Sequence, residues 1–120
     1  MGYYVVRSEQ GPSWNSAQSM REQKLWTEHA AYINSLLATD KMILGGPIGD
    51  GNPYRAMVVL IAANEAEVRQ RLSDDPWYKA GVLRAVSVER WEMIATNDKL
   101  DPALKDIAGD SGPSHGQAAR

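Results

Sequence analysis

Cysteine is absent from this 120-residue chain. Disulfide bonds, thiolate metal sites and cysteine nucleophiles are therefore excluded as sources of its stability or its chemistry. The absence is also typical of a reducing compartment, so we expect a cytoplasmic protein.

Long hydrophobic runs are also missing. The longest one, Ala56 to Ala63, is far shorter than the roughly 20 apolar residues of a membrane-spanning helix. The N-terminus has no basic segment followed by a long apolar one, so no export signal is predicted. We expect a soluble protein without a membrane partner.

Excess charge of one sign is the third thing that the chain lacks. It has 13 basic and 15 acidic residues, a net charge of −2, and no run of five like charges. Nucleic-acid binding requires a basic stripe that neutralises phosphates, so a nucleic-acid partner is not expected.

Histidine is scarce, with only His29 and His115 present. Two histidines this far apart, without a His-x-His or His-x-x-x-His pair, predict no metal site. No serine lies in a recognisable nucleophile elbow. We therefore expect no metal and no cofactor.

Four strands are predicted from short β-branched and apolar runs that end at turn-forming residues. The run at Met57–Ile61 has no polar interruption, which is typical of a strand in the middle of a sheet. The last strand is long and of mixed polarity, which predicts an edge or an interface. The predicted strands are 3–6, 42–44 (ending at Gly45-Gly46-Pro47), 57–61 and 82–94.

Helices are predicted between these strands. Ser19 followed by Glu22 matches a capping box, so a helix should begin there and run through Trp26 to Ala38. Asn64 followed by Glu67 predicts a second helix, which should end near Asp74. Pro76 directly after Asp75 predicts a further short helix to about Gly81.

The resulting order, βαββαβ, predicts a ferredoxin-like α+β fold, with a four-stranded antiparallel sheet and both helices on one face. The other face would then be uncovered, and we expect a homodimer in which two sheets pack face to face. We place the domain at residues 1–95. Residues 96–120 are rich in polar residues and predict a flexible tail, with at most a helical turn at Pro102 to Ile107.

His29 is the residue best suited to chemistry. At 100° per residue it falls within an apolar stripe of the first long helix, and histidine titrates near neutrality, as a general acid or base requires. A structural histidine held by one hydrogen bond would satisfy the same position. The stripe consists of Trp26, His29, Ala30, Ile33, Leu36 and Leu37.

Asp75 is the candidate partner of His29. A carboxylate can orient an imidazole and fix its tautomer. An Asp directly before Pro76 is equally suited to cap a helix. One carboxylate has two oxygens, so both roles are compatible.

Other candidate ligand-binding residues have ordinary structural alternatives. The pair Gly45-Gly46, with Pro47, would allow close approach of a ligand but would also end a strand. Trp14, Trp26 and Trp77 could line a pocket, or form core. Arg7 and Arg84 could bind a carboxylate, although strand-edge arginines mostly meet solvent or acidic neighbours.

Five motifs in this order resemble the YciI-like (YCII-related) proteins, over residues from Tyr3 to Met93. The resemblance implies a dimeric α+β barrel and an active site formed by His29 and Asp75. One branch of that family dehydrochlorinates a chlorinated hydroxyhydroquinone. Trp77 stands where many members have Phe. The motifs are the N-terminal Tyr-Val-Val, Trp26-Thr27-Glu28-His29, Leu44-Gly45-Gly46-Pro47 with Asp50-Gly51, Asp74-Asp75-Pro76-Trp77 and Val88-Glu89-Arg90-Trp91.

Three functions agree with these features. The first is a cofactor-independent enzyme in which a His29–Asp75 dyad moves protons during elimination, isomerisation or hydration of a small cyclic or aromatic molecule. The second is a small-molecule-binding or regulatory module, for example one linked to transcription, without catalysis. The third is an interaction domain that acts through its sheet face, which predicts that His29 is sealed from solvent.

Overall fold

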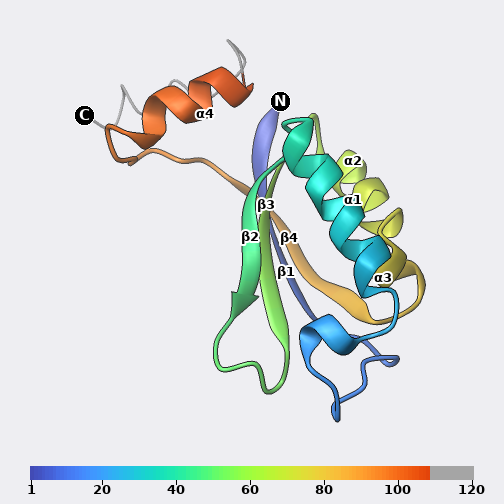
Figure 1. Ribbon diagram of the computed structural model, residues 1–120. Coiled ribbons are helices and arrows are strands. Elements are labelled where there is room, and N and C mark those ends of the chain that lie inside the picture. Colours follow the sequence, from blue (N-terminus) through green and yellow to red (C-terminus); the bar gives the residue numbers. More distant parts are fainter. Residues whose placement is uncertain (109–120) are drawn as a thin grey trace.

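The computed structural model describes residues 1–108, apart from the side chains of Lys105 and Ala108. Four strands and a set of helices alternate along the chain, and three of the α-helices cover one face of the sheet (Figure 1). The strands are β1 (Gly2–Gln10), β2 (Met42–Ile48), β3 (Arg55–Ala62) and β4 (Leu83–Trp91). The helices are the 3₁₀ turn η1 (Met20–Glu22), α1 (Trp26–Ala38), α2 (Glu65–Ser73), α3 (Pro76–Lys79) and α4 (Leu100–Ala108).

The sheet is antiparallel, with strand order β2-β3-β1-β4. This is the ferredoxin-like α+β arrangement, and the fold class predicted from the sequence is confirmed. β3 lies inside the sheet, as its uninterrupted apolar sequence predicts, and β2 and β4 are the two edges.

The face of the sheet toward α1 and α2 carries the main hydrophobic core. Alternate residues of β1 and β3 point to this face, and they pack against residues from both helices. Val6, Leu60 and Val68 are fully buried there. The core consists of Tyr4, Val6, Leu36, Met42, Leu60, Ala62, Val68 and Val88.

Strand β4 does not keep the single alternation that its sequence predicts. Ser8 pairs with Ala85 and Arg7 pairs with Ser87, so Val86 has no opposite residue and forms a bulge. Residues after the bulge point to the opposite face from the one that a regular strand would give them. Leu83 and Val88 therefore share the face toward the helices, and both are buried. A regular strand would place these two on opposite faces.

Strand β2 does not end at Gly45-Gly46-Pro47. It continues to Ile48, and the three residues pair with Val58, Met57 and Ala56 of β3. Because β2 is an edge strand, Pro47 can lie in it without removing a hydrogen bond from the sheet interior. Gly45 is needed for packing, since a Cβ there would lie 2.5 Å from Cγ1 of Val58.

The helix expected from Ser19 is interrupted. The Ser19 amide donates to the Glu22 carboxylate at 2.8 Å, as the capping box predicts, but the turn that follows is only η1. Leu25 then adopts a left-handed conformation (φ 63°), and α1 begins at Trp26. The buried amide of Gln23 explains the break, because it donates to backbone carbonyls of the preceding loop.

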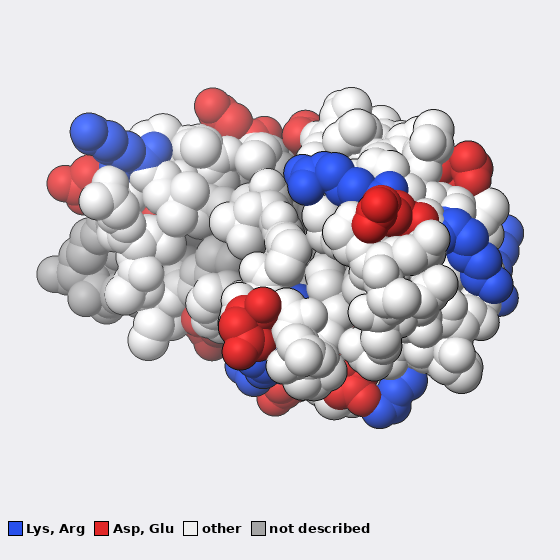
Figure 2. Space-filling model, turned by 60° about the horizontal axis from the view of Figure 1, so that its bottom comes forward, with Lys and Arg blue, Asp and Glu red and all other residues white. Residues whose placement is uncertain are grey.

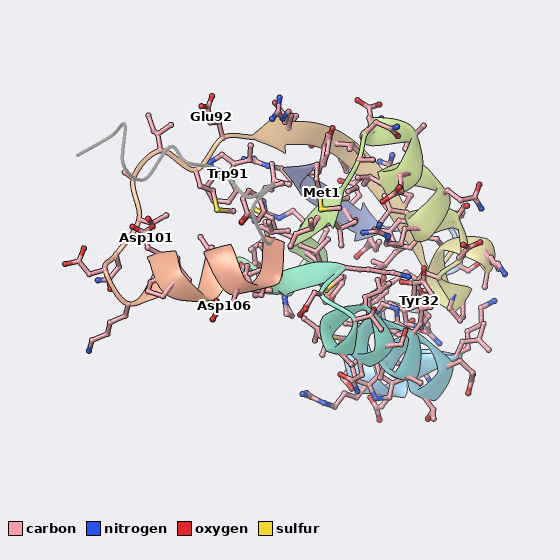
Figure 3. The ribbon with its side chains drawn as sticks, turned by 90° about the horizontal axis from the view of Figure 1, so that it is seen from above. Met1, Tyr32, Trp91, Glu92, Asp101 and Asp106 are labelled. Atoms are coloured by element: carbon pink, nitrogen blue, oxygen red, sulfur yellow. The ribbon has the colours of Figure 1, made fainter. Side chains whose placement is uncertain are left out.

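The segment expected to be a flexible tail begins with helix α4. Leu104 is buried against the second face of the sheet, where it contacts the cluster of Tyr3, Val59 and Ile61. Seen along the strands, α4 and Trp91 lie on one side of the sheet, and Tyr32 and α1 on the other (Figure 3). Residues 109–120 lie outside the described part of the chain.

We predict that Gly45→Ala destabilises the domain by about 1–3 kcal/mol, because Val58 or the β2 backbone must move to accept the new methyl group. Gly46→Ala is the matched control, since a Cβ at Gly46 meets nothing within 4 Å. Urea denaturation of both variants measures the difference. Equal free energies of unfolding would contradict the packing role of Gly45.

Candidate functional site

A cavity of about 360 Å³ lies between α1 and the sheet. All six residues of the predicted apolar stripe of α1 line it, and of these only Leu36 is classed as buried. The stripe therefore faces an open space over much of its length instead of packing tightly on the strands. Such a volume is at the lower end of the range of small-molecule pockets, roughly 300–1,000 Å³.

Asp75 and His29 meet at the wall of this cavity. The Nδ1 atom of His29 lies 2.9 Å from each carboxylate oxygen of Asp75. Oδ1 of Asp75 also accepts a hydrogen bond of 2.9 Å from the backbone N–H of Trp77. Both roles considered for Asp75, helix cap and partner of an imidazole, are thus present in the geometry.

The ring of His29 is held on its flat side as well. It stacks on the indole of Trp77, with ring centroids 3.9 Å apart and planes 6° from parallel. Trp77 is itself fixed, because it is fully buried and its Nε1 donates to the carbonyl of Lys24 at 2.8 Å. Carboxylate and indole together determine the position and the orientation of the imidazole.

The second ring nitrogen of His29 is available for chemistry. A carboxylate can only accept, so the proton of the His29–Asp75 bond is on Nδ1, and Nε2 of the neutral ring carries the lone pair. Nε2 makes no hydrogen bond to any residue within 1–108. The side chain is 12% exposed and lines the cavity, so it is not sealed as a pure interaction domain would predict.

Four hydroxyl groups of the described residues lie at the same cavity, and no sequence motif singles them out. One of them, Tyr32 Oη, donates to the carbonyl of Arg71 at 2.7 Å. Ser8 Oγ and Tyr78 Oη are hydrogen-bonded to each other, and Tyr54 Oη donates to the sulfur of Met20 at 3.1 Å. Burial raises the pKa of Tyr78 to about 12, with a smaller contribution from the nearby charge of Asp75. Burial also raises the pKa of Tyr54. Both phenols therefore stay protonated at neutral pH.

The rest of the lining is mostly apolar. Arg71 is the only arginine or lysine in it, and its guanidinium already bonds the carbonyls of Lys41 and Ile61 and the carboxylate of Glu67. Among the described lining residues, the imidazole, the hydroxyls and the side-chain amide of Asn34 are therefore the polar groups left to orient a bound molecule. The apolar lining includes Ile33, Leu36, Leu37, Met42, Val58, Leu60 and Leu72.

The other predicted ligand-binding residues divide into two groups. Gly45, Gly46 and Pro47 line the cavity, on the β2 side. Trp14 and Trp77 do not. Trp77 is buried behind His29, and Trp14 stacks on Tyr54 at 4.4 Å between ring centroids, so both support the wall from outside. Trp26, which was considered with them, does line the cavity.

Two further candidates, Arg84 and Arg7, lie away from the cavity and do not line it. Arg84 pairs with Glu9 across the edge of the sheet, and Arg7 is exposed on β1. His115 lies outside the described residues.

The distribution of charge on the surface is not the one that binding of a polyanion such as a nucleic acid requires. Figure 2 shows basic and acidic side chains mixed over one face, without a continuous basic stripe. Within residues 1–108, no cluster of three or more His, Asp or Glu could hold a metal ion. None of the helices in that range has the length and apolarity needed to cross a bilayer.

A family model, that of the YCII-related domain, matches residues 2–92. The chain belongs to the YCII-related family. The resemblance noted in the sequence is thereby confirmed, and the matched region ends just after β4, before α4 begins. No curated protein sequence matches the chain.

Among solved structures, this YCII-related protein is similar to 5-chloro-2-hydroxyhydroquinone dehydrochlorinase from Burkholderia phenoliruptrix AC1100, in complex with 2,5-dihydroxybenzoquinone. The two share 26% sequence identity with a TM-score of 0.57, over 74% of this chain and 92% of the other. The neighbour is thus an enzyme whose small ligand is an oxygen-bearing ring.

We predict that Asp75→Ala destabilises the protein by about 2 kcal/mol or more, because it removes the cap of α3 and leaves the buried N–H of Trp77 without its acceptor. Asp75→Asn keeps one acceptor oxygen and should lose less. Chemical denaturation gives both values. Asp74→Ala, at the exposed neighbouring carboxylate, is the control and should change stability by at most about 0.5 kcal/mol. A loss for Asp75→Ala as small as that of this control would contradict the capping role.

Proposed function

We propose that this YCII-related protein is a cofactor-independent enzyme that uses His29 as a general acid and base on a small cyclic or aromatic molecule. The observation that carries the proposal is the contact of His29 Nδ1 with both oxygens of Asp75 at the wall of the cavity. A buried carboxylate, a fixed imidazole and an adjoining pocket are the parts that general acid and base catalysis needs.

In this proposal each member of the dyad has a separate task. Nε2 of His29 takes a proton from the bound molecule, and Asp75 stabilises the imidazolium that forms and prevents the ring from turning. In an isomerisation the proton returns from Nε2 to another atom of the same molecule. In an elimination the leaving group departs with the electrons of its bond, as chloride does, and the proton passes from Nε2 to solvent. In a hydration Nε2 takes its proton from the attacking water and gives it to the substrate.

The lining of the cavity supports a ring as the substrate. Apolar side chains of α1 and the sheet make up most of it, and His29 and a few hydroxyl groups belong to the same lining. The ligand named for the similar dehydrochlorinase, 2,5-dihydroxybenzoquinone, has the same combination of a flat ring and polar substituents. Chlorinated hydroxyhydroquinones are therefore the first substrates to assay.

We expect turnover of 5-chloro-2-hydroxyhydroquinone, measured as chloride release, to fall roughly 100-fold or more in His29→Gln, because general acid and base catalysis contributes about 10²–10⁴-fold. His115→Gln is the matched control, the same substitution at the only other histidine, and it should retain full activity.

Binding of 2,5-dihydroxybenzoquinone separates this proposal from a binding module without catalysis. A wild-type protein that binds this molecule but turns over none of a panel of hydroxylated and chlorinated rings, together with equally tight binding by His29→Gln, would favour the binding module. A His29→Gln variant with unchanged turnover would rule out the catalytic role of the imidazole.

We also propose that the protein forms a homodimer through the sheet face opposite α1. Val5 and Met57 of this face are only partly buried, and Trp91 at its edge is 44% exposed. Helix α4 covers one end of the same face, so the partner would pack beside α4 on the remaining part. Apolar surface of this kind is typical of an interface.

We expect sedimentation equilibrium at micromolar concentration to give twice the 13.2 kDa mass of the chain. Val5→Lys should shift the equilibrium toward the monomer, because it places a charge in the middle of the proposed interface. A wild-type protein that sediments only as a monomer would contradict the dimer.

A further inference from the structure

The hydroxyl pair formed by Ser8 and Tyr78 has one more hydrogen-bond donor than the bond between the two oxygens uses. Ser8 projects from β1, Tyr78 from α3, and the two oxygens are hydrogen-bonded to each other. Each hydroxyl is one donor, and a single bond between them consumes one of the two. The other O–H has no acceptor among the described residues.

The surplus donor lies at the cavity. Ser8 is 4% exposed, Tyr78 is partly buried, and both residues line the cavity that contains His29. A buried polar group without a partner loses about 1–3 kcal/mol relative to a satisfied one. The surplus O–H is therefore best satisfied by an acceptor in the cavity, either a water molecule or an atom of the ligand.

The Tyr78 hydroxyl keeps its proton over the whole physiological pH range. Burial raises the pKa of Tyr78 to about 12, so the phenol does not ionise and the pair always presents a proton. Ser8 and Tyr78 come from the strand and from α3, whereas His29 comes from α1. A molecule in the cavity thus meets an imidazole from one element and a hydroxyl donor from others.

We propose that the Ser8–Tyr78 pair is the oxygen-binding subsite of the cavity and donates a hydrogen bond to a carbonyl, hydroxyl or enolate oxygen on the ring of the ligand. This inference rests on the proposed function, because it concerns the molecule on which His29 acts. It restricts the substrate class to rings that carry at least one such oxygen. When His29 removes a proton from the ring system, the pair stabilises the electron density that collects on this oxygen.

The decisive test uses the double variant Ser8→Ala/Tyr78→Phe. Each single variant leaves one hydroxyl that can take over the bond to the ligand, whereas the double variant removes both donors. It should remain folded, because replacing both partners of a buried hydrogen bond by apolar groups is nearly neutral. Tyr3→Phe is the matched control, the same loss of a phenol oxygen on the opposite side of the sheet, where Tyr3 donates to the carbonyl of Leu104.

Hydroquinone, 2,5-dihydroxybenzoquinone and p-xylene are the probes, and NMR titration gives their dissociation constants. Methyl groups replace the ring oxygens in p-xylene, so its affinity reports the shape of the cavity alone. We expect the double variant to bind the two oxygenated rings roughly 2- to 10-fold more weakly and p-xylene as the wild type does. Tyr3→Phe should change none of the three values.

An unchanged preference for oxygenated rings in the double variant would overturn the subsite, and so would an equal loss for all three probes. Either result leaves the role of His29 standing, because chloride release tests that role separately. Failure of the wild type to bind any of the probes would contradict the subsite and the proposed substrate class together.

Discussion

The buried carboxylate of Asp75 joins parts of the chain that would otherwise be independent. It caps the short helix α3, and it reaches 46 residues back along the chain to the ring of His29 on α1. A carboxylate with so little exposure is tolerated only when it is hydrogen-bonded, and here the Trp77 N–H donates to Oδ1 while Nδ1 of His29 lies 2.9 Å from both oxygens. This one side chain thus ties the N-terminal end of α1, at the wall of the cavity, to α3.

The cavity exists because α1 stands away from the sheet. Its apolar stripe would bury more surface by packing directly on the strands, and the strands offer apolar residues for that purpose. Contacts at the N-terminal end of the helix, with Trp77 behind His29 and Asp75 beside it, hold it in place. The fold thus gives up part of the hydrophobic stabilisation that direct packing would supply, and a cavity next to an imidazole remains.

Local patterns in the sequence predicted most of the fold. The order of strands and helices along the chain follows from apolar runs and turns, and Asn64 and Asp75 cap the helices that their spacing predicts. The expectation that Asp75 lies beside His29 came from its side-chain chemistry and from the family resemblance, since nothing in the spacing places residues 29 and 75 together.

Features that depend on contacts across the sheet could not be predicted. The bulge at Val86 is determined by its pairing with β1, and the place of Gly45 within β2 by the side chain of Val58. Ser8 and Tyr78 are 70 residues apart, and neither stands in a recognisable motif. Only the antiparallel pairing of β1 and the turn into α3 bring their hydroxyls to the same cavity.

The stack of His29 on Trp77 gives the site an optical property. An indole in face-to-face contact with an imidazole loses part of its fluorescence when the imidazole becomes positively charged. With 3.9 Å between the ring centroids, the emission of Trp77 is coupled to the protonation of His29. The chain therefore carries an intrinsic fluorophore in contact with this imidazole, and the arrival of a proton on the ring can be followed in time without any added label.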